Sequence, residues 1–342
     1  MVSAPAKVLV RAPTWLGDVV MATPVLRALR SAHPKAEIVL EGRPGLAELV
    51  KDLPTLDAFL PDPEDGWLAR ARRLRAQRFD WAVLLPDSVR AAAGPWLARI
   101  PVRIGYARDP LRRLMLTHAL EPPRQGGKRL PISMLERYLR LTRTLGCPDP
   151  APLELELPVD PAAASAIFAR LEREGVARDA RLLIVTPGAS FGASKLWPPE
   201  HFARACDGIA REHGLVPVLA PGPGEEELAR QVLAQLGVRG VALTDPPARL
   251  PELVALIDRA SLVLTNDTGP RHVAVARGCP TVVLMGPTDP RHTAHLLERQ
   301  RVLREPVECS PCHLKVCPVP GHPCMTKLAP ERAVAAAREL LA

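Results

Sequence analysis

The sequence predicts an α/β protein made of two Rossmann-like domains, each with a parallel sheet. Short apolar or β-branched runs alternate with amphipathic stretches along both halves of the chain. A proline-rich break at residues 147–162 separates the halves. With 342 residues, each half can bury its own core. We expect one domain over residues 1–155 and another over 156–342, which ends in a cysteine-rich loop, 309–324, and a terminal helix, 330–342.

Each apolar run is expected to form a strand that is followed by a helix. In the first domain we predict strands at residues 7–10, 37–40 and 81–85, with helices after Asp18, Pro44 and Asp65. In the second we predict strands at 182–186, 216–220, 241–243, 262–265 and 281–285, with helices starting near Pro199, Gly224, Leu250 and Pro270. Ligands of such sheets bind beyond the carboxyl ends of the strands, so two such domains would enclose a ligand cleft.

Composition excludes some partners and locations. Aromatic residues make up 4% of the chain, too few for the base-stacking surfaces of a single-stranded nucleic-acid binder. No apolar run approaches the eighteen residues of a membrane-spanning helix. Arg11 and Asp18 interrupt the region where a signal peptide would need an apolar run. We therefore expect a cytoplasmic protein that does not bind nucleic acid.

The positive charge is confined to the first half. Residues 1–150 hold 24 Lys and Arg against 15 Asp and Glu, a net of +9, whereas residues 151–342 hold 21 against 22, a net of −1. The arginine run at 70–78 is typical of a solvated helix face. A second group lies between turns and suggests a surface for an acidic ligand or an anionic membrane. Its members are Arg103, Arg108, Arg112, Arg113, Arg124 and Arg129, and the first four are the candidates for binding an acidic acceptor.

Four of the seven cysteines crowd into one loop, whose sequence is CSPCHLKVCPVPGHPC. They are Cys309, Cys312, Cys317 and Cys324. In the cytosol such a cluster suggests a structural zinc ion, although C-x2-C-x4-C-x6-C is not a standard zinc-finger spacing. Unligated thiols in a proline-stiffened loop are the alternative. The acidic segment DPED, residues 62–65, is expected in an exposed turn and does not stand out as a DxD-type metal site. The sequence therefore requires no divalent metal ion.

The loop after the first strand, RAPTWLGD, contains one glycine and lacks the glycine-rich turn of nicotinamide-binding domains. It presents Asp18 directly before an apolar helix. An aspartate at that point commonly caps the helix. It could instead serve as a general base if an acceptor hydroxyl comes within hydrogen-bonding reach.

Two loops of the second half suggest a phosphate and ribose site. One, TPGASFGASKLWP, combines small residues such as Ser190 with Lys195, which could present its charge to phosphate. The alternative is a solvated lysine beside a buried Trp197. The other loop, APGPGEEELAR, contains Glu225, which could hold a ribose diol or simply complement a helix dipole.

The last loop, TNDTGPRHVA, follows an apolar strand and opens a helix. A helix N-terminus leaves backbone N–H groups free and favours anions. Thr268 and Gly269 lie where those donors begin, with Asp267 before them and His272 after them. The alternative is that Asn266 or Asp267 caps the helix and His272 packs beneath it.

Taken together, these loops resemble those of glycosyltransferase family 9, the bacterial ADP-heptose:lipopolysaccharide heptosyltransferases, and most closely the type II enzymes. The similarity covers nearly the whole chain. It rests on the order and spacing of the segments APTWLGDVVMATPVLRALR, PGASFGASKLWP, GPGEEE, TNDTGPRHVA and GPTDP, and on the cysteine-rich tail. The resemblance implies a GT-B fold, two facing Rossmann-like domains with the acceptor on the first and an ADP-sugar on the second.

The resemblance also implies a role for each matching residue. Asp18 matches the catalytic base that deprotonates the acceptor heptose hydroxyl, and transfer then inverts the sugar. The donor residues are a phosphate-binding Lys195 and Ser190, backbone donors at Thr268 and Gly269, Glu225 at the adenosine ribose, Asp267 at the sugar hydroxyls and an orienting His272. The co-substrate would be ADP-heptose, and the acceptor the heptosylated Kdo–lipid A core at the cytoplasmic face of the inner membrane.

The chain differs from the family's pattern in two segments. The segment TDPPARLPEL replaces the family's usual loop near the adenine, and Pro270 and Arg271 are bulkier than the common residues. A type I or III heptosyltransferase, or another nucleotide-sugar transferase of the family, is therefore an alternative. A sugar-nucleotide epimerase would need a second acid/base pair within one domain, and no such pair is evident. A two-domain ligand-binding protein would leave Asp18 without a task.

Overall fold

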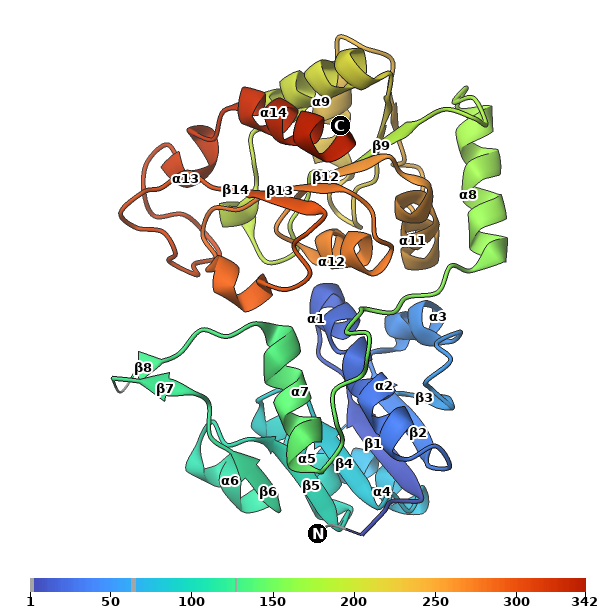
Figure 1. Ribbon diagram of the computed structural model, residues 1–342, viewed down its shortest axis with the longest axis vertical. Coiled ribbons are helices and arrows are strands. Elements are labelled where there is room, and N and C mark those ends of the chain that lie inside the picture. Colours follow the sequence, from blue (N-terminus) through green and yellow to red (C-terminus); the bar gives the residue numbers. More distant parts are fainter. Residues whose placement is uncertain (1–2, 63–65, 127) are drawn as a thin grey trace. The chain divides into compact units, whose positions relative to one another are not determined.

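In the computed structural model, which describes residues 3–62, 66–126 and 128–342, the chain divides into two compact units. Unit 1 comprises residues 1–158 and a short segment, Arg291–His295, and unit 2 comprises Val159–Pro290 and Leu296–Ala342. Each unit is built on a six-stranded parallel sheet covered by helices (Figure 1). The prediction of two Rossmann-like domains is confirmed. Within the described residues, no helix is both long and apolar enough to cross a membrane.

The sheet of unit 1 has the strand order β3-β2-β1-β4-β5-β6. Its strands are β1 (Lys7–Arg11), β2 (Glu37–Gly42), β3 (Ala58–Pro61), β4 (Trp81–Leu84), β5 (Val102–Tyr106) and β6 (His118–Leu120). The two central strands are β1, which pairs with β2 on its outer side, and β4, which pairs with β1. The chain continues from β1 toward one edge of the sheet and from β4 toward the opposite edge. Such a switch point is where parallel sheets bind ligands.

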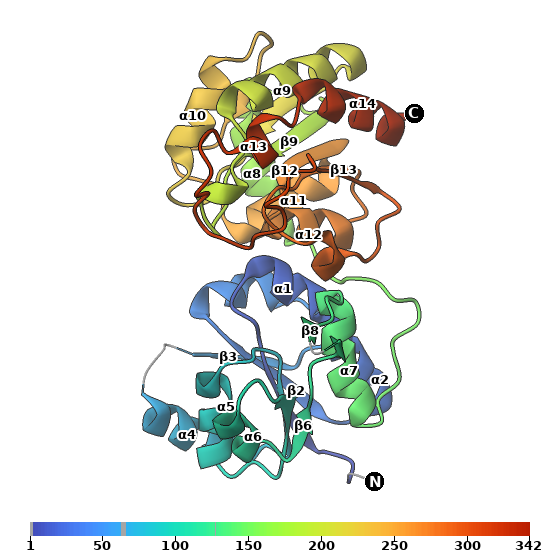
Figure 2. The same ribbon diagram turned by 90° about the vertical axis from the view of Figure 1, so that its left-hand side faces the viewer.

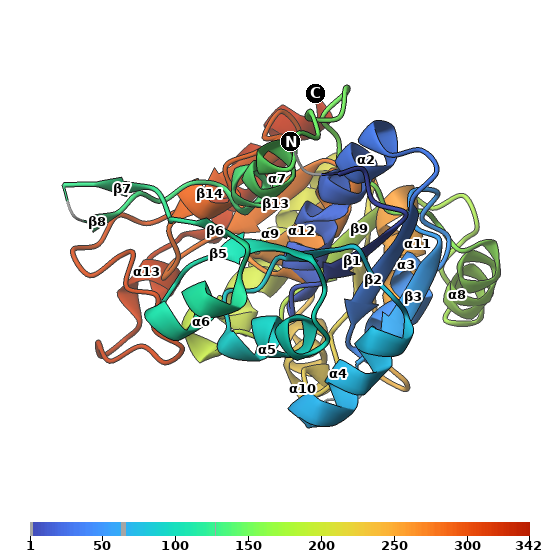
Figure 3. The ribbon, with the colours of Figure 1, turned by 90° about the horizontal axis from the view of Figure 1, so that it is seen from below.

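Helices cover both faces of the unit 1 sheet, as Figure 3 shows. On one face lie α1 (Leu16–Met21), α2 (Thr23–Ala32) and α7 (Met134–Thr144), and on the other lie α4 (Trp67–Ala76), α5 (Val89–Leu97) and α6 (Pro110–Met115). A short 3-10 turn, Pro44–Leu46, and α3 (Ala47–Val50) lead from β2 to β3, while β7 (Arg124–Gln125) and β8 (Lys128–Arg129) form a separate antiparallel pair. Leucine and alanine side chains of the sheet, α4 and α5 form the core of the second face.

Unit 2 repeats the same topology, with the strand order β11-β10-β9-β12-β13-β14. Figure 2 shows β9, β12 and β13 of this sheet among the surrounding helices. The strands are β9 (Leu182–Thr186), β10 (Val216–Leu219), β11 (Val241–Ala242), β12 (Leu262–Asn266), β13 (Thr281–Leu284) and β14 (Gln300–Leu303). Its switch point lies between β9 and β12, which are paired. The loops that carry Lys195 and Thr268 follow these two strands, so they begin at the same edge of the sheet.

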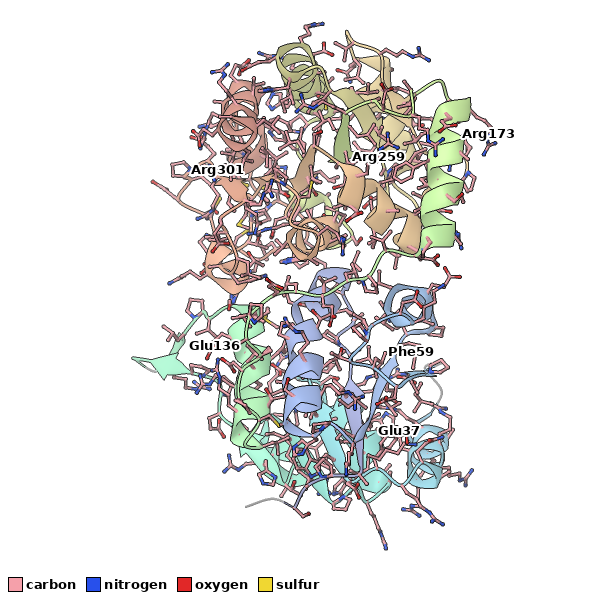
Figure 4. All side chains as sticks on the ribbon, turned by 45° about the vertical axis from the view of Figure 1, so that its right-hand side comes forward. Glu37, Phe59, Glu136, Arg173, Arg259 and Arg301 are labelled. Carbon is pink, nitrogen blue, oxygen red and sulfur yellow. The ribbon has the colours of Figure 1, made fainter. Side chains whose placement is uncertain are left out.

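The helices of unit 2 are α8 (Pro161–Arg173), α9 (Pro199–His213), α10 (Glu226–Ala234), α11 (Leu250–Arg259), α12 (Gly269–Ala276), α13 (Pro323–Thr326) and α14 (Pro330–Leu341), with 3-10 turns at Ala193–Lys195 and Pro290–Thr293. Trp197 is fully buried in the core formed with α9 and α14, where its indole N–H donates to the Leu328 carbonyl at 2.9 Å. Arg259, labelled in Figure 4, links α11 to α8 because its guanidinium lies 4.6 Å from the centre of the Phe168 ring.

The strands expected from apolar runs are present within a residue or two of their predicted bounds. β3, β5, β6 and β14 were not predicted, because they are short, partly exposed or interrupted by charged residues. The helix expected after Asp65 begins at Trp67. Pro63, Glu64 and Asp65 themselves lie outside the described residues.

A buried ion network joins the carboxyl ends of β1 and β2 to helix α4. The Arg70 guanidinium donates to both carboxylate oxygens of Glu41, at 2.7 and 2.5 Å, and both side chains are almost completely buried. Arg11 pairs with Asp62 at 2.7 Å. Two expectations were therefore wrong: Arg70 is not part of a solvated helix face, and Asp62 is buried rather than in an exposed turn. Each charge is buried because an opposite charge lies beside it.

Replacing Arg70 with alanine should destabilise unit 1 by about 3 kcal/mol, because it leaves the buried Glu41 carboxylate without its bidentate partner. Unfolding in urea can be followed by tryptophan fluorescence, since Trp15, Trp67, Trp81 and Trp96 lie in unit 1. The exposed Arg72 on the same helix provides the control, and Arg72→Ala should stay within about 0.5 kcal/mol. Equal effects of the two substitutions would contradict a stabilising role of the pair.

Candidate functional site

Asp18 lies in the first turn of α1, directly beyond the carboxyl end of β1. The helix begins at Leu16 and its N-cap residue is Trp15, so Asp18 is not the capping residue. Its half-buried carboxylate accepts a hydrogen bond from the Tyr138 hydroxyl. Burial and the charge of Asp18 raise the pKa of Tyr138 well above its usual value, so that the phenol stays protonated and remains a donor.

Helix α7 brings two adjacent side chains over the switch point of unit 1. Beside Tyr138, the Arg137 guanidinium pairs with Asp87, which follows β4, and lies 3.8 Å from the centre of the Tyr106 ring at the end of β5. The Tyr106 hydroxyl donates to the Arg137 carbonyl at 2.9 Å. These contacts hold α7 beside the ends of β4 and β5.

The four arginines expected to face an acidic acceptor differ in their surroundings. Arg112 is fully buried, and its guanidinium donates to the carbonyls of Tyr106, Ser88 and Pro86. Arg103 is half-buried and donates to the carbonyls of Met115 and Ile100. The expectation of a free charged surface was wrong for these two. Arg112 joins the loop after β4 to the end of β5, and Arg103 joins the segment before β5 to the end of α6. Arg108 and Arg113 are exposed.

In unit 2, Lys195 contacts the loop that follows β12. Its ammonium donates to the Asp267 carbonyl and, at 2.9 Å, to the Asp267 carboxylate, and only 12% of the side chain is exposed. The alternative of a solvated lysine is therefore wrong. The 3-10 turn that ends at Lys195 thus brings one positive charge to the start of α12.

Asp267 is the centre of a buried polar cluster. One carboxylate oxygen accepts from Lys195 and from the Thr288 hydroxyl at 2.7 Å, and the other accepts from Arg271 at 2.9 Å. Burial opposes ionisation of this carboxyl, but Lys195 and Arg271 outweigh it and hold its pKa well below the usual value. Asp267 is therefore ionised at neutral pH and holds Lys195 in place.

Helix α12 begins at Gly269 with Thr268 as its N-cap residue. No side-chain hydrogen bond from the described residues caps this helix, so the alternative in which Asn266 or Asp267 is the cap is not found. The Asn266 amide instead donates to the Pro187 carbonyl at 2.6 Å, which ties the β9 and β12 loops together. Backbone N–H groups at an uncapped helix start favour an anion. His272 is buried within the first turn.

Glu225 is held against the β9 loop. Its carboxylate accepts from the Gly222 N–H at 2.8 Å, and a Cβ on Gly188 would lie 1.7 Å from its Oε2 atom. Only glycine at position 188 therefore leaves room for this side chain. Burial raises the pKa of Glu225, and hydrogen bonds from the backbone of Gly222 and Ala189 oppose that shift.

The cysteine-rich loop packs directly against the Lys195 loop. The Ser194 hydroxyl donates to the Leu314 carbonyl at 2.5 Å, and the His322 imidazole lies 2.8 Å from the Ser194 carbonyl. Gly192 adopts a φ of +152°, and a Cβ there would lie 2.4 Å from the Lys315 carbonyl oxygen. Ser194 is therefore a structural residue, whereas Ser190 is exposed at the turn.

The zinc interpretation of this loop is not supported. Across residues 3–62, 66–126 and 128–342, no three His, Cys, Asp or Glu side chains gather in a way that could hold a metal ion. Burial, followed by the nearby Cys317, Cys309 and Cys312, raises the pKa of Cys324 to about 11, so its thiol stays protonated. The loop acts through its packing.

A site at each of two Rossmann-type switch points, one with a carboxylate and one with a lysine at an uncapped helix, is typical of GT-B nucleotide-sugar glycosyltransferases. Comparison with known proteins gives the family. Residues 67–322 match the family model described as glycosyltransferase family 9 (heptosyltransferase). The chain belongs to this family of enzymes.

Similar proteins of known name support the same assignment. The chain is 31% identical to lipopolysaccharide heptosyltransferase 2 of Salmonella typhimurium and 30% identical to that of Escherichia coli K12, over 87% of this chain and 88% of each relative. The solved E. coli ADP-heptose lps heptosyltransferase II is 28% identical, covers 98% of both chains and superposes with a TM-score of 0.80. A family 9 structure from Veillonella parvula has the same fold, with a TM-score of 0.84 at 24% identity.

Several residues that shape these sites were not predicted from the sequence. Tyr138 and Arg137 lie in an amphipathic helix whose pattern, MLERYLRL, indicates only packing. Arg271 was noted for its size, and its pairing with Asp267 became evident only in the fold. Thr288 stands 21 residues beyond Asp267 and meets it only because β12 and β13 are adjacent.

We expect Tyr138→Phe to lower kcat/KM and to move the acidic side of its pH profile to higher pH. Without the phenol donor the charged form of Asp18 loses a hydrogen bond, so protonation, and with it loss of activity, sets in at higher pH. The test is a pH series of kcat/KM for heptose transfer. Tyr106→Phe removes the only other tyrosine hydroxyl, also hydrogen-bonded, and should leave the profile in place. Identical shifts in both variants would remove Tyr138 from this role.

Proposed function

We propose that the chain transfers L-glycero-D-manno-heptose from ADP-heptose to the heptosylated Kdo–lipid A inner core. The observation that carries this proposal is the Lys195 ammonium, held by Asp267 at the uncapped start of α12. The ammonium supplies a positive charge, and the start of α12 supplies backbone N–H donors beside it. This combination suits the diphosphate of a nucleotide sugar. The identity to named heptosyltransferases supports the sugar and the acceptor.

The donor would occupy the carboxyl edge of the unit 2 sheet. Lys195 and the N–H groups of Thr268 and Gly269 would bind the phosphates, and the exposed Ser190 would add a hydroxyl donor. Glu225, held by Gly222, would accept from the adenosine ribose. Both carboxylate oxygens of Asp267 already accept hydrogen bonds, so we propose that Asp267 positions Lys195. The contact of Asp267 with the hydroxyls of the donor sugar stays a prediction. His272 would orient the helix start.

The reaction itself would need a base and a stabilised leaving group. Asp18 would take the proton from an acceptor hydroxyl while that oxygen attacks the anomeric carbon of the donor. The bond from this carbon to the β-phosphate oxygen breaks as the new glycosidic bond forms, which inverts the anomeric configuration. Negative charge then gathers on the β-phosphate, where Lys195 and the α12 donors would stabilise it. No metal ion is required for this sequence.

The acceptor is expected to be anionic and membrane-bound. We propose that unit 1 binds it, with the exposed Arg108 offered to its carboxylates and phosphates, and with Arg113, which pairs with the exposed Glu121, beside it. The enzyme would then act at the cytoplasmic face of the inner membrane as a peripheral protein. The nearest alternative is a related acceptor, because a relative named lipopolysaccharide heptosyltransferase 3, from Escherichia coli, matches at 25% identity over 80% of this chain.

Two substitutions should separate chemistry from donor binding. Asp18→Asn should lower kcat by about 10²- to 10⁴-fold and leave ADP affinity unchanged, because the base acts in the transition state. Lys195→Met should weaken ADP binding, since the phosphates lose their cation. Isothermal titration with ADP, combined with transfer kinetics, measures both effects. Normal turnover by Asp18→Asn would eliminate the proposed base.

The acceptor can be assigned by comparing two lipid A cores. ADP-heptose is supplied with either the mono-heptosylated or the heptose-free core, and UDP- and GDP-sugars serve as donor controls. We expect transfer only from ADP-heptose and only to the mono-heptosylated core, detected by the mass of one added heptose. Transfer to the heptose-free core would indicate type I specificity, and no transfer from ADP-heptose would refute the proposal.

A further inference from the structure

The outer side of α4, α5 and α6 carries an unusual concentration of exposed large apolar side chains. They are Trp67 and Leu68 on α4, Trp96 on α5, and Leu111 and Leu114 on α6. Leu114 is 77% exposed and Leu68 is 66% exposed. Exposed apolar side chains of this size gathered on adjoining elements indicate a surface that meets another apolar phase.

The three helices form one continuous layer on one face of the unit 1 sheet (Figure 3). Polar contacts hold them together: Arg70 of α4 donates to the Arg90 carbonyl of α5 at 2.8 Å, and Arg75 donates to the Leu97 carbonyl at 2.6 Å. Arg112 of α6 donates to the Ser88 carbonyl at the start of α5. The apolar side chains therefore stand on a rigid base.

The same segment carries nearly all of the protein's excess charge. Residues 67–115 contain eleven arginines and three aspartates, a net of +8, equal to the formal charge of the whole chain. Seven of these arginines are exposed: Arg72, Arg75, Arg78, Arg90, Arg99, Arg108 and Arg113. The three aspartates are engaged elsewhere, because Asp80 accepts from the Ala6 and Lys7 N–H groups, Asp87 from Arg137, and Asp109 from the Arg112 N–H. Of the seven exposed arginines, Arg113 pairs with the exposed Glu121, which follows β6.

We propose that the outer surface of α4, α5 and α6, here called the α4–α6 face, docks the protein onto an anionic lipid bilayer. Tryptophan and leucine side chains would enter the interfacial region, and the surrounding arginines would meet lipid phosphates. The proposal extends the proposed function, because a lipid-linked acceptor must be reached at a membrane surface.

The chemistry of the α4–α6 face favours a bilayer over other occupants. A second copy would bring two faces of the same positive charge together, which is repulsive. A nucleic acid would match the arginines, but Leu68, Leu111 and Leu114 would have no partner along a phosphate backbone. Only an anionic bilayer offers negative charge and an apolar layer within a few ångströms of each other.

Cosedimentation with vesicles that contain no acceptor tests docking separately from catalysis. The full chain should bind vesicles of phosphatidylglycerol mixed with phosphatidylcholine, and binding to pure phosphatidylcholine should be at least tenfold weaker. Leu111→Ser combined with Leu114→Ser should lower the partition coefficient about tenfold or more, because two exposed leucines no longer insert. The matched control is Leu314→Ser with Val316→Ser, which are 46% and 71% exposed in unit 2 and should have no effect.

Charge reversal provides a second, independent arm. Arg72→Glu on the α4–α6 face should weaken vesicle binding several-fold, whereas Arg178→Glu, 88% exposed in unit 2, should have little effect. The proposal would be overturned if each α4–α6 variant lost no more vesicle binding than its unit 2 control. It would also be overturned by binding that shows no preference for phosphatidylglycerol, or by tighter binding to a DNA duplex than to vesicles. Transfer to an acceptor stripped of its acyl chains should be unchanged in Leu111→Ser/Leu114→Ser. If wild type shows no transfer, the proposed function fails while the vesicle result still stands.

Discussion

The ion pairs of the buried Asp267 carboxylate are the interactions on which the loops at the carboxyl edge of the unit 2 sheet depend. The carboxylate joins Lys195 from the β9 loop, Arg271 from α12 and Thr288 from the segment after β13. A buried charge with this many partners is held rigidly, because losing any one of them weakens the compensation of the Asp267 charge in a low-dielectric site. The depressed pKa of Asp267 means that this stabilisation is present above the ordinary aspartate range, near pH 4, and is lost as the pH falls below it.

Around that carboxylate, the fold uses backbone packing to position the donor loops. Gly188 gives the Glu225 side chain its space, and Gly192 allows the cysteine-rich loop to lie against the turn that carries Lys195. The contacts of Ser194 with Leu314 and His322 are part of the same arrangement. The cysteine-rich loop therefore supports the Lys195 turn directly through its packing.

Features that depend on neighbouring residues in the chain could be predicted from the sequence, whereas features that depend on residues far apart in the chain could not. Apolar runs are local signals, so the central strands and the loops with Asp18, Lys195 and Thr268 could be placed from sequence alone. Charge partners are set by topology, so Arg70, Arg112 and Asp62 were assigned to the surface although each is buried against groups far away in the chain. The resemblance to known heptosyltransferases implied roles for individual residues, but it did not reveal Tyr138 beside Asp18.

In unit 1, the layer formed by α4, α5 and α6 has arginines of two kinds, buried ones that stabilise the fold and exposed ones on the outer surface. The arginines that face inward from α4 and α6, Arg70 and Arg112, are saturated by Glu41 and by loop carbonyls, and they fix the helices to the sheet. Among the arginines that face outward, Arg113 pairs with the exposed Glu121, and the three aspartates within residues 67–115 serve other groups. Side chains of one type thus have two physical roles, set by burial alone. The proposed contact with a lipid bilayer would use the outward arginines together with the adjoining tryptophan and leucine side chains.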